Sequence, residues 1–265
     1  MSPNDAKASR QKLDSAVIES ALGVLGCAWV QLDVRDQVES TNDDALAHRS
    51  EVEPGHAWAV TAEEQLAGRG RLDRAWSSPW GAGIALSVCC STDDVTGSLS
   101  SVPLRVGVAI VKALHNLGVA TQVKWPNDVV TTDEPMRKLG GVLVQLHDDV
   151  LVIGMGINVS LQSDELPTDQ ATSLSLMGCE QVTREDVIAS VINSVHSELR
   201  NEEWRADYRS HSRTIGQTVR VNRINHDDVV GQASDISESG ALLVDTRDGL
   251  IEISMGDVHH LRAEE

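Results

Sequence analysis

A short stretch of the chain combines arginines with glycines in a way that suits the binding of an anion. The run GRGRLDR at positions 68–74 holds three arginines and one aspartate, a local charge of +2 in a chain of formal net charge −18. Guanidinium groups match phosphate and carboxylate geometry with paired hydrogen bonds, and glycines let the backbone approach a ligand closely. The run predicts a flexible anion-clamping loop, although its composition equally fits a solvated loop that binds nothing.

A lysine occupies the first position of the motif KWPND at 124–128. Lys124 is one of five lysines in the chain, and its neighbours Val123 and Trp125 are apolar. Because Pro126 stops a strand, the lysine amine is expected at a strand end rather than on an open surface. In a chain with so few lysines we interpret this position as functional.

Two further segments carry small and polar residues at expected strand ends. The run RKLGG at 137–141 begins a strand and could let a ligand pack against its glycines, or it could be an ordinary hairpin after the acidic turn 133–135. The run GMGIN at 154–158 ends a strand. The amide of Asn158 can both donate and accept, which suits an adenine edge; the alternative is a β-bulge with a structural asparagine.

Motifs of several common enzyme classes are absent from the sequence. It contains no G-x-x-x-x-G-K-[S/T] phosphate loop, no G-x-S-x-G turn and no evident acid–base pair of carboxylates. The four cysteines form no C-x-x-C pair, which favours small apolar residues of a reduced protein over a redox or zinc role. His259 and His260 have no metal-ligand neighbours at suitable spacing. We therefore predict surface or core histidines there and no dedicated metal site.

The charge balance narrows the function further. The chain has 40 acidic and 22 basic residues, and such a surface is repelled by phosphate backbones and anionic membranes. Residues 1–12 are polar and lack the apolar core of a signal peptide, and no apolar run of about 18 residues could span a membrane. We therefore expect a cytoplasmic protein that binds neither nucleic acid nor membranes.

The elements that must position these segments follow from apolar periodicity and capping residues. Helices are predicted over 14–25, over 43–48 after the N-cap residues Ser40, Thr41 and Asn42, over 101–117, and from Thr183, where Asp186 completes a capping box. Strands are predicted over 29–34, 57–62, 84–90, 121–125, 140–146 and 150–157, and 65–83 is a loop. Short apolar runs separated by turn residues after position 214 indicate a small β-barrel.

The predicted organisation is a disordered terminus over 1–12, an α+β domain over 13–213 and a small β module over 214–265. Only about 28 residues precede the first predicted strand, too few for a helix-turn-helix domain with its linker.

In their order and spacing these segments resemble the biotin protein ligases. The matching runs are STN at 40–42, Gln65 with AGRGR at 67–71, RAW at 74–76, KWPND at 124–128, KLGG at 138–141, GIN at 156–158 and GALL at 240–243. The resemblance covers roughly residues 29–262. It implies a catalytic domain related to class II aminoacyl-tRNA synthetases, with a mixed sheet, followed by a small SH3-like barrel. It also implies a ligase without the DNA-binding domain of members that act as repressors.

The resemblance implies a two-step ligase reaction. The biotin carboxylate attacks the α-phosphate of ATP to give biotinyl-5′-AMP and pyrophosphate. A lysine of a biotin carboxyl carrier domain, of the acetyl-CoA carboxylase type, then displaces AMP. Mg²⁺ is expected to arrive with the ATP phosphates. The enzyme is expected to be a monomer or a homodimer.

Residue roles are also implied by the resemblance. Lys124 and Arg71 are expected to be catalytic, because they bring positive charge to the place where two anions meet. The expected biotin-binding residues are Ser40, Thr41, Asn42, Gln65, Arg69, Gly70, Arg71, Lys124 and Gly141. The expected ATP-binding residues are Arg69, Arg71, Arg74, Trp76, Lys138 and Asn158.

The chain departs from the family at one position of the arginine loop. Asp73 stands where the pattern G-R-G-R-x-G-R has glycine, and we expect it to pair with Arg71 or Arg74 when the loop is empty. Three alternatives remain at this point: a lipoate or octanoate transferase on the same fold, a biotin sensor that regulates transcription, and a binding protein whose arginine loop is inert.

Overall fold

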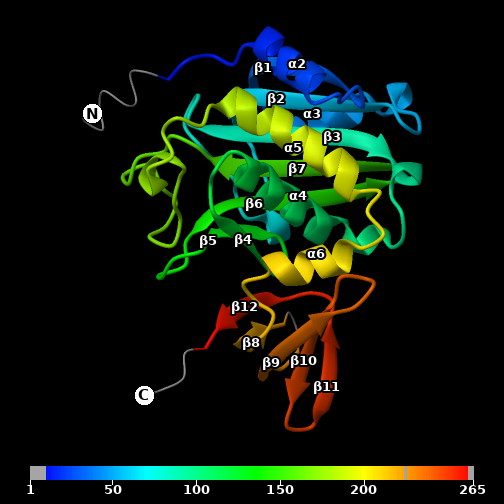
Figure 1. The fold of residues 1–265 in the computed structure, drawn as a ribbon, viewed down its shortest axis with the longest axis vertical. Helices are drawn as coiled ribbons and strands as arrows, with labels where there is room; N and C mark the ends of the chain where they lie inside the picture. The colour runs from blue at the N-terminus through cyan, green and yellow to red at the C-terminus, as the bar shows by residue number, and fades with distance from the viewer. Residues whose placement is uncertain (1–9, 224–225, 262–265) are drawn as a thin grey trace.

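The computed structural model describes residues 10–223 and 226–261. They form a large sheet covered by helices and, beneath it in Figure 1, a smaller separate sheet. A mixed sheet with helices, joined to an antiparallel sheet, confirms the predicted α+β class.

The large sheet holds the segments singled out above at the ends of its strands. Its order is β1-β2-β3-β7-β6-β5-β4, and only the β1–β2 pair is parallel. The strands are β1 (Val30–Val38), β2 (Ala57–Gln65), β3 (Gly83–Ser91), β4 (Thr121–Lys124), β5 (Asp128–Thr131), β6 (Lys138–His147) and β7 (Val150–Asn158). Lys124 ends β4 and Asn158 ends β7, as their positions in the sequence predicted.

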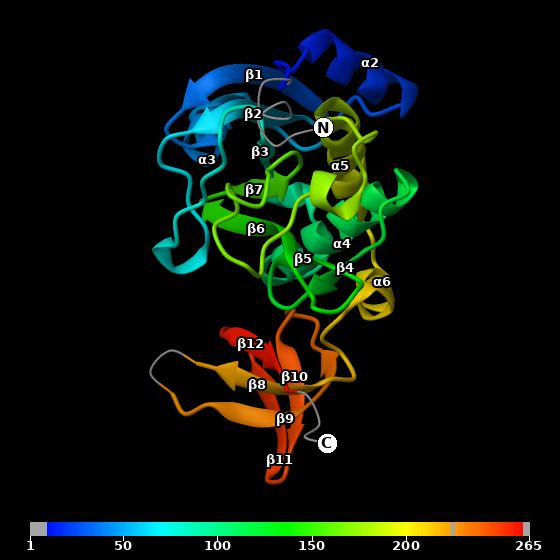
Figure 2. The same ribbon diagram turned by 90° about the vertical axis from the view of Figure 1, so that its left-hand side faces the viewer.

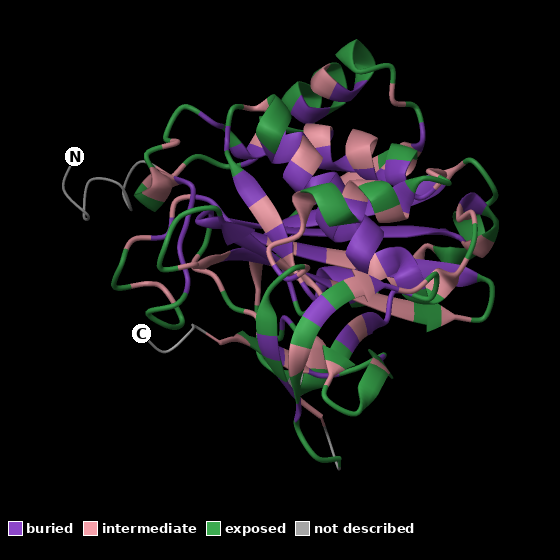
Figure 3. Ribbon diagram, turned by 60° about the horizontal axis from the view of Figure 1, so that its bottom comes forward, coloured by how far each residue is buried: buried purple, intermediate pink, exposed green. Residues whose placement is uncertain are grey.

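Helices cover the two faces of this sheet unequally. Figure 2 shows α3 (Thr41–Ala47) on one side, and α2 (Ser15–Val24), α5 (Arg184–Glu198) and α4 (Val102–Asn116) on the other. The apolar stripe of α4 is fully buried, because it packs between the sheet and α5. Purple strands between green outer helix surfaces in Figure 3 mark this core. Over the described ranges, no helix has both the length and the apolar character needed to cross a membrane.

Three local features differ from the sequence-based expectation. Strand β5 was not predicted, because its four residues lie between two turns. Helix α6 (Trp204–His211) was also missed, since Trp204 and Tyr208 are its only buried residues. Helix α3 begins at Thr41 rather than Asp43, and Ser40 makes no side-chain capping bond.

The smaller sheet is antiparallel throughout and lies against the end of the large one. Its order is β11-β10-β9-β8-β12. The strands are β8 (Thr218–Asn222), β9 (Val229–Ile236), β10 (Leu242–Thr246), β11 (Gly249–Ile253) and β12 (Asp257–His260). The buried Trp125 joins the two sheets, because its indole Nε1 donates to the carbonyl of Gly240 at 3.1 Å. The residue after Lys124 is thus fixed by the smaller sheet.

The prediction of disorder over residues 1–12 can be compared with the structure only at residues 10–12. Residues 1–9 lie outside the described residues. Arg10 instead contacts Glu165, and Lys12 pairs with Asp36 on β1. The prediction was therefore wrong for these two side chains.

Candidate functional site

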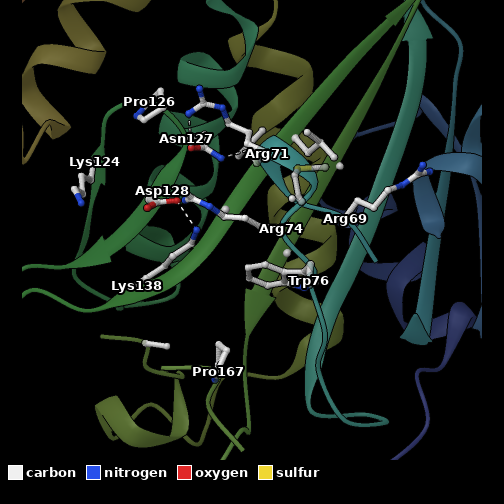
Figure 4. A pocket seen from close by; sticks show the side chains of 18 of the residues that line it. Arg69, Arg71, Arg74, Trp76, Lys124, Pro126, Asn127, Asp128, Lys138 and Pro167 are labelled. Atoms are coloured by element: carbon white, nitrogen blue, oxygen red, sulfur yellow. Dashed lines mark hydrogen bonds and ion pairs between the residues drawn. The ribbon is translucent and has the colours of Figure 1, made fainter. Parts of the chain in front are cut away.

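A pocket of about 490 Å³ opens on the α3 side of the large sheet (Figure 4). Every residue that the sequence assigned to biotin or ATP lines it. These residues are Ser40, Thr41, Asn42, Gln65, Arg69, Gly70, Arg71, Arg74, Trp76, Lys124, Lys138, Gly141 and Asn158. Segments distant in the sequence thus share one cavity.

The arginines of the loop at 68–74 are held by three different elements. Arg69 forms two bonds of 2.5 and 2.6 Å to the carboxylate of Asp43 on α3. Arg71 donates to Asn127 Oδ1 at 3.3 Å, and Arg74 pairs with Asp257 on β12. Figure 4 shows Arg69 turned away from the other two. Two of the three positive charges are therefore neutralised by carboxylates of the protein.

The predicted pairing of Asp73 stays a prediction. The side chain of Asp73 lies outside the described part of the structure.

Lys124 is a half-buried cation in the lining of the pocket. Burial lowers the pKa of its amine, an effect that Asp128 opposes and Lys138 reinforces. Asp128 pairs with Lys138 at 2.5 Å, and among the described residues no carboxylate pairs directly with Lys124. Burial, together with Lys124 and Arg213, lowers the pKa of His260 to about 4. A neutral imidazole therefore lies near the lysine at neutral pH.

The end of the pocket next to α3 is a chain of polar side chains. The side-chain oxygen Oε1 of Gln65 accepts hydrogen bonds from the backbone N–H and the hydroxyl of Thr41, at 2.9 and 3.0 Å. The hydroxyl of Ser87 lies 2.6 Å from Asn42 Oδ1, and Asn42 Nδ2 donates to Gln145 Oε1 at 2.6 Å. These contacts fix which way the Thr41 and Asn42 groups point.

Ser87 and Gln145 were not found by sequence reasoning. The available signal for Ser87 was a polar residue inside an otherwise apolar run, which forms strand β3 and buries the serine fully. Gln145 carried no signal, because its role depends on β6 and α3 meeting in space.

Two glycines of β7 make room for pocket side chains. A Cβ at Gly154 would lie 2.3 Å from Asn42 Oδ1, and one at Gly156 would lie 2.3 Å from Trp76 Cε2. Both distances are far below van der Waals contact, so both side chains occupy space that only glycine leaves. Glycine at these positions therefore shapes the pocket.

The other end of the pocket surrounds Asn158. Its Nδ2 donates to the carbonyl of Thr172 at 2.9 Å, and the residue belongs to the pocket lining. Pro167, Thr168 and Gln170 complete this wall from the loop that follows β7. The hydrogen bond shows a structural role for Asn158, and its expected contact with adenine stays a prediction.

Strand β12 forms a wall that the sequence did not predict. Asp257, Val258 and His259 line the pocket. His259, predicted as a surface or core histidine, is exposed and also belongs to this wall. The cysteines lie outside it, and no cluster of three or more histidine, cysteine or acidic residues that could hold a metal occurs among the described residues.

The pocket as a whole combines several cations with uncharged polar groups from α3 and from the loop after β7. Arg71, Arg74, Lys124 and Lys138 all line the cavity, and Figure 4 shows Lys124 on the far side of Asp128 from Arg74. Such a set of cations can hold two anionic groups against each other and stabilise the charge that develops when they react.

Comparison with known proteins gives matches along nearly the whole chain. Residues 34–161 match the biotin/lipoate A/B protein ligase family, and residues 214–261 match the biotin protein ligase C-terminal domain. A biotin–[acetyl-CoA-carboxylase] ligase of Mycobacterium tuberculosis is 36% identical, covering 96% of this chain and 97% of the relative. A bifunctional ligase/repressor of Bacillus subtilis is 29% identical, covering 89% of this chain and 74% of the relative.

A solved structure shares the fold. The biotin protein ligase from Aquifex aeolicus in complex with biotin and ATP superimposes with a TM-score of 0.73 at 28% identity. The match covers 88% of this chain and 99% of that one.

Proposed function

Because the chain belongs to the biotin protein ligase family, we infer that it is a biotin–[acetyl-CoA-carboxylase] ligase. It activates biotin with ATP to biotinyl-5′-AMP and transfers the biotinyl group to a lysine of a biotin carboxyl carrier protein. The observation that carries this function is the single pocket in which Arg71, Lys124 and Lys138 lie between an amide-rich end and the Asn158 end. Two ligands with a shared anionic centre fit that arrangement.

The proposed assignment places biotin at the α3 end. There Ser40, Thr41, Asn42 and Gln65 offer donors and acceptors for the ureido ring, and Gly141, Gly70 and Arg69 line the rest. Lys124 and Arg71 then lie where the biotin carboxylate meets the α-phosphate. Arg74, Lys138, Trp76 and Asn158 are assigned to ATP, with Asn158 toward the adenine.

The chemistry of the pocket is positioning and charge stabilisation. In the first step a carboxylate oxygen bonds to the α-phosphorus and pyrophosphate leaves. In the second step the carrier amine bonds to the activated carbonyl carbon, AMP leaves with the electron pair of the C–O bond, and the amine loses a proton. Both steps concentrate negative charge near Lys124, and fixed cations in a site that excludes water lower such barriers strongly.

Two arginines of the loop must leave their carboxylate partners before they can contact ATP. Arg69 and Arg74 are bound to Asp43 and Asp257, and their side chains are 47% and 64% exposed. Exposed ion pairs of this kind contribute only about 0–1 kcal/mol. Guanidinium–phosphate contacts in a closed site are stronger, so ATP can displace both carboxylates and draw the loop over the intermediate.

Mg²⁺ fits the site as a partner of ATP rather than of the protein. The described part of the chain offers no three-ligand acidic or histidine cluster, and Mg²⁺ in nucleotide sites is commonly held by phosphates and water. Bound Mg²⁺ would neutralise phosphate charge, while Lys138 and Arg74 would hold the phosphates.

We extend the proposal to domains and partner. A catalytic domain over 13–213 and a small domain over 214–265 are supported by the two separate sheets. The carrier protein is the expected partner, and the cytoplasm is the expected compartment for this reaction.

The function is tested by biotin-dependent exchange of pyrophosphate into ATP, followed by transfer to a purified carrier domain. We expect exchange with biotin and none with lipoate or octanoate, and biotin on one lysine of the carrier. Exchange that depends on lipoate instead would assign the chain to the lipoate branch of the fold.

A second expected result concerns Gly154. Its replacement by alanine forces Asn42 away from Ser87 and Gln145, because the new methyl would lie 2.3 Å from Asn42 Oδ1. Disturbing such buried hydrogen bonds costs about 1–3 kcal/mol, so the KM for biotin should rise about 10- to 100-fold. The KM for ATP should change little. Gly23→Ala is the matched control, since nothing lies within 4 Å of a Cβ there. Equal effects on both substrates would contradict the assignment of this end to biotin.

A further inference from the structure

The segment before α2 contacts the loop after β7, which lies about 150 residues later in the chain. Arg10 Nη2 donates to Glu165 Oε2 at 2.5 Å and approaches the carbonyl of Ser160 at 3.4 Å. The side chains of Arg10 and Glu165 are only 7% and 11% exposed. A nearly buried ion pair therefore joins the N-terminal segment to the loop after β7.

That loop forms the Asn158 end of the pocket. Glu165 Oε2 also accepts from the backbone of Gln162 at 2.9 Å, which fixes the first turn of the loop. Two residues later Pro167 enters the pocket wall, followed by Thr168 and Gln170 (Figure 4). The loop then joins β6 through Lys138, whose N–H donates to the carbonyl of Gln170 at 2.7 Å.

Arg10 itself lies outside the pocket lining. It packs beside Gly81, where a Cβ would lie 3.3 Å from Arg10 Cβ. Gly81 has φ +65°, so the chain turns there in a conformation that favours glycine. Arg10 can therefore act on a ligand only through the loop.

We propose that Arg10 is a positioning residue for ATP, because its ion pair with Glu165 holds the loop that walls the adenine end of the pocket. This inference rests on the proposed function, which assigns that end to ATP. Removing the guanidinium leaves a buried carboxylate without this cation and favours its movement toward water. The wall at Pro167, Thr168 and Gln170 then loses its fixed position, whereas the biotin end keeps all its contacts.

The test separates ATP from biotin. In Arg10→Met, which keeps most of the aliphatic volume, the KM for ATP at saturating biotin should rise about 10- to 100-fold, the size expected for a lost charged hydrogen bond. The KM for biotin at saturating ATP should stay near that of the unaltered protein. Arg10→Lys keeps the charge and should recover part of the loss.

Lys12→Met is the matched control. Lys12 lies in the same segment and pairs with Asp36 at 2.5 Å, but both side chains are well exposed, at 59% and 69%. This variant should leave both KM values unchanged. Thermal unfolding of all three variants shows whether each one is folded.

Three outcomes would overturn the inference. These are an unchanged KM for ATP in folded Arg10→Met, a parallel rise in both KM values, or an equal rise in the Lys12 control. If Arg10→Met does not fold, Arg10→Lys decides the question, because the KM for ATP should again rise while the KM for biotin stays unchanged. If the proposed function is wrong, the unaltered chain will show no biotin-dependent exchange of pyrophosphate. In that case the affinity of each variant for ATP can still be compared by calorimetry.

Discussion

Lys124→Ala is expected to reduce the rate of biotin adenylation about 100- to 1000-fold, the usual effect of losing a fixed donor at a charged transition state. Lys124 is a half-buried cation in the pocket lining, and no carboxylate among the described residues pairs with it. Its charge is therefore available to the substrates. The loss should fall on kcat as well as on kcat/KM, measured by pyrophosphate exchange.

Lys12→Ala removes an exposed lysine far from the pocket and serves as the control. Near-normal exchange by Lys124→Ala, with a normal control, would contradict the catalytic role. Thermal unfolding of the impaired variant near the temperature of the unaltered protein would show that it is folded.

The pH dependence gives an independent check on Lys124. Burial lowers the pKa of the amine, so its charge is lost as the pH rises through that lowered pKa. The alkaline limb of kcat/KM should therefore fall at a lower pH than an ordinary lysine would give. Bound anionic substrates favour the charged amine, so the alkaline limb of the kcat profile should lie at higher pH than that of kcat/KM. An arginine stays charged over this range, and Lys124→Arg should flatten the limb.

Arg71→Met should have the second largest effect. Burial lowers the pKa of Arg71, but a guanidinium remains charged far above neutral pH. Unlike Arg69 and Arg74, it contacts a neutral amide, Asn127, and is therefore free to bind phosphate without first leaving a carboxylate. We expect adenylation to slow by about 10- to 1000-fold, the range for loss of a charged clamp.

The same variant should lose biotinyl-5′-AMP to water, because the loop would no longer cover the anhydride. The readout is the ratio of AMP released without carrier to biotin attached when carrier is present. Arg35→Met is the control, since Arg35 pairs with Asp33 on β1 and its side chain is 49% exposed. Slow adenylation without a change in that ratio would show that Arg71 acts in catalysis but does not protect the anhydride from water.

The site residues that sequence reasoning found are those with a local signal. The glycines and arginines at 68–71 stand side by side in the chain, and KWPND places Lys124 two residues before a strand-ending proline. Ser87, Gln145 and Asp257 could not be found in this way. Their roles depend on which elements meet in space, and Asp257 lies on β12 of the smaller sheet, which Trp125 and other contacts join to the large sheet.

The fold shows the same division. Helix α4 was predictable because its apolar stripe is long and regular, whereas β5 and α6 bury only a few side chains each. Short elements of this kind are defined by the surfaces on which they pack, which one sequence does not reveal.

The wall that β12 contributes also sets when the pocket is completed during protein synthesis. Arg74 and Asp257 are 183 residues apart in the chain, and a ribosome releases the N-terminal part of a chain first. The large sheet can therefore form while β12 is still being made. A nascent chain at that stage has the arginine loop and Lys124 but not Asp257, Val258 and His259. The complete pocket thus arises only once β12 has been made, after the strands that carry its other walls.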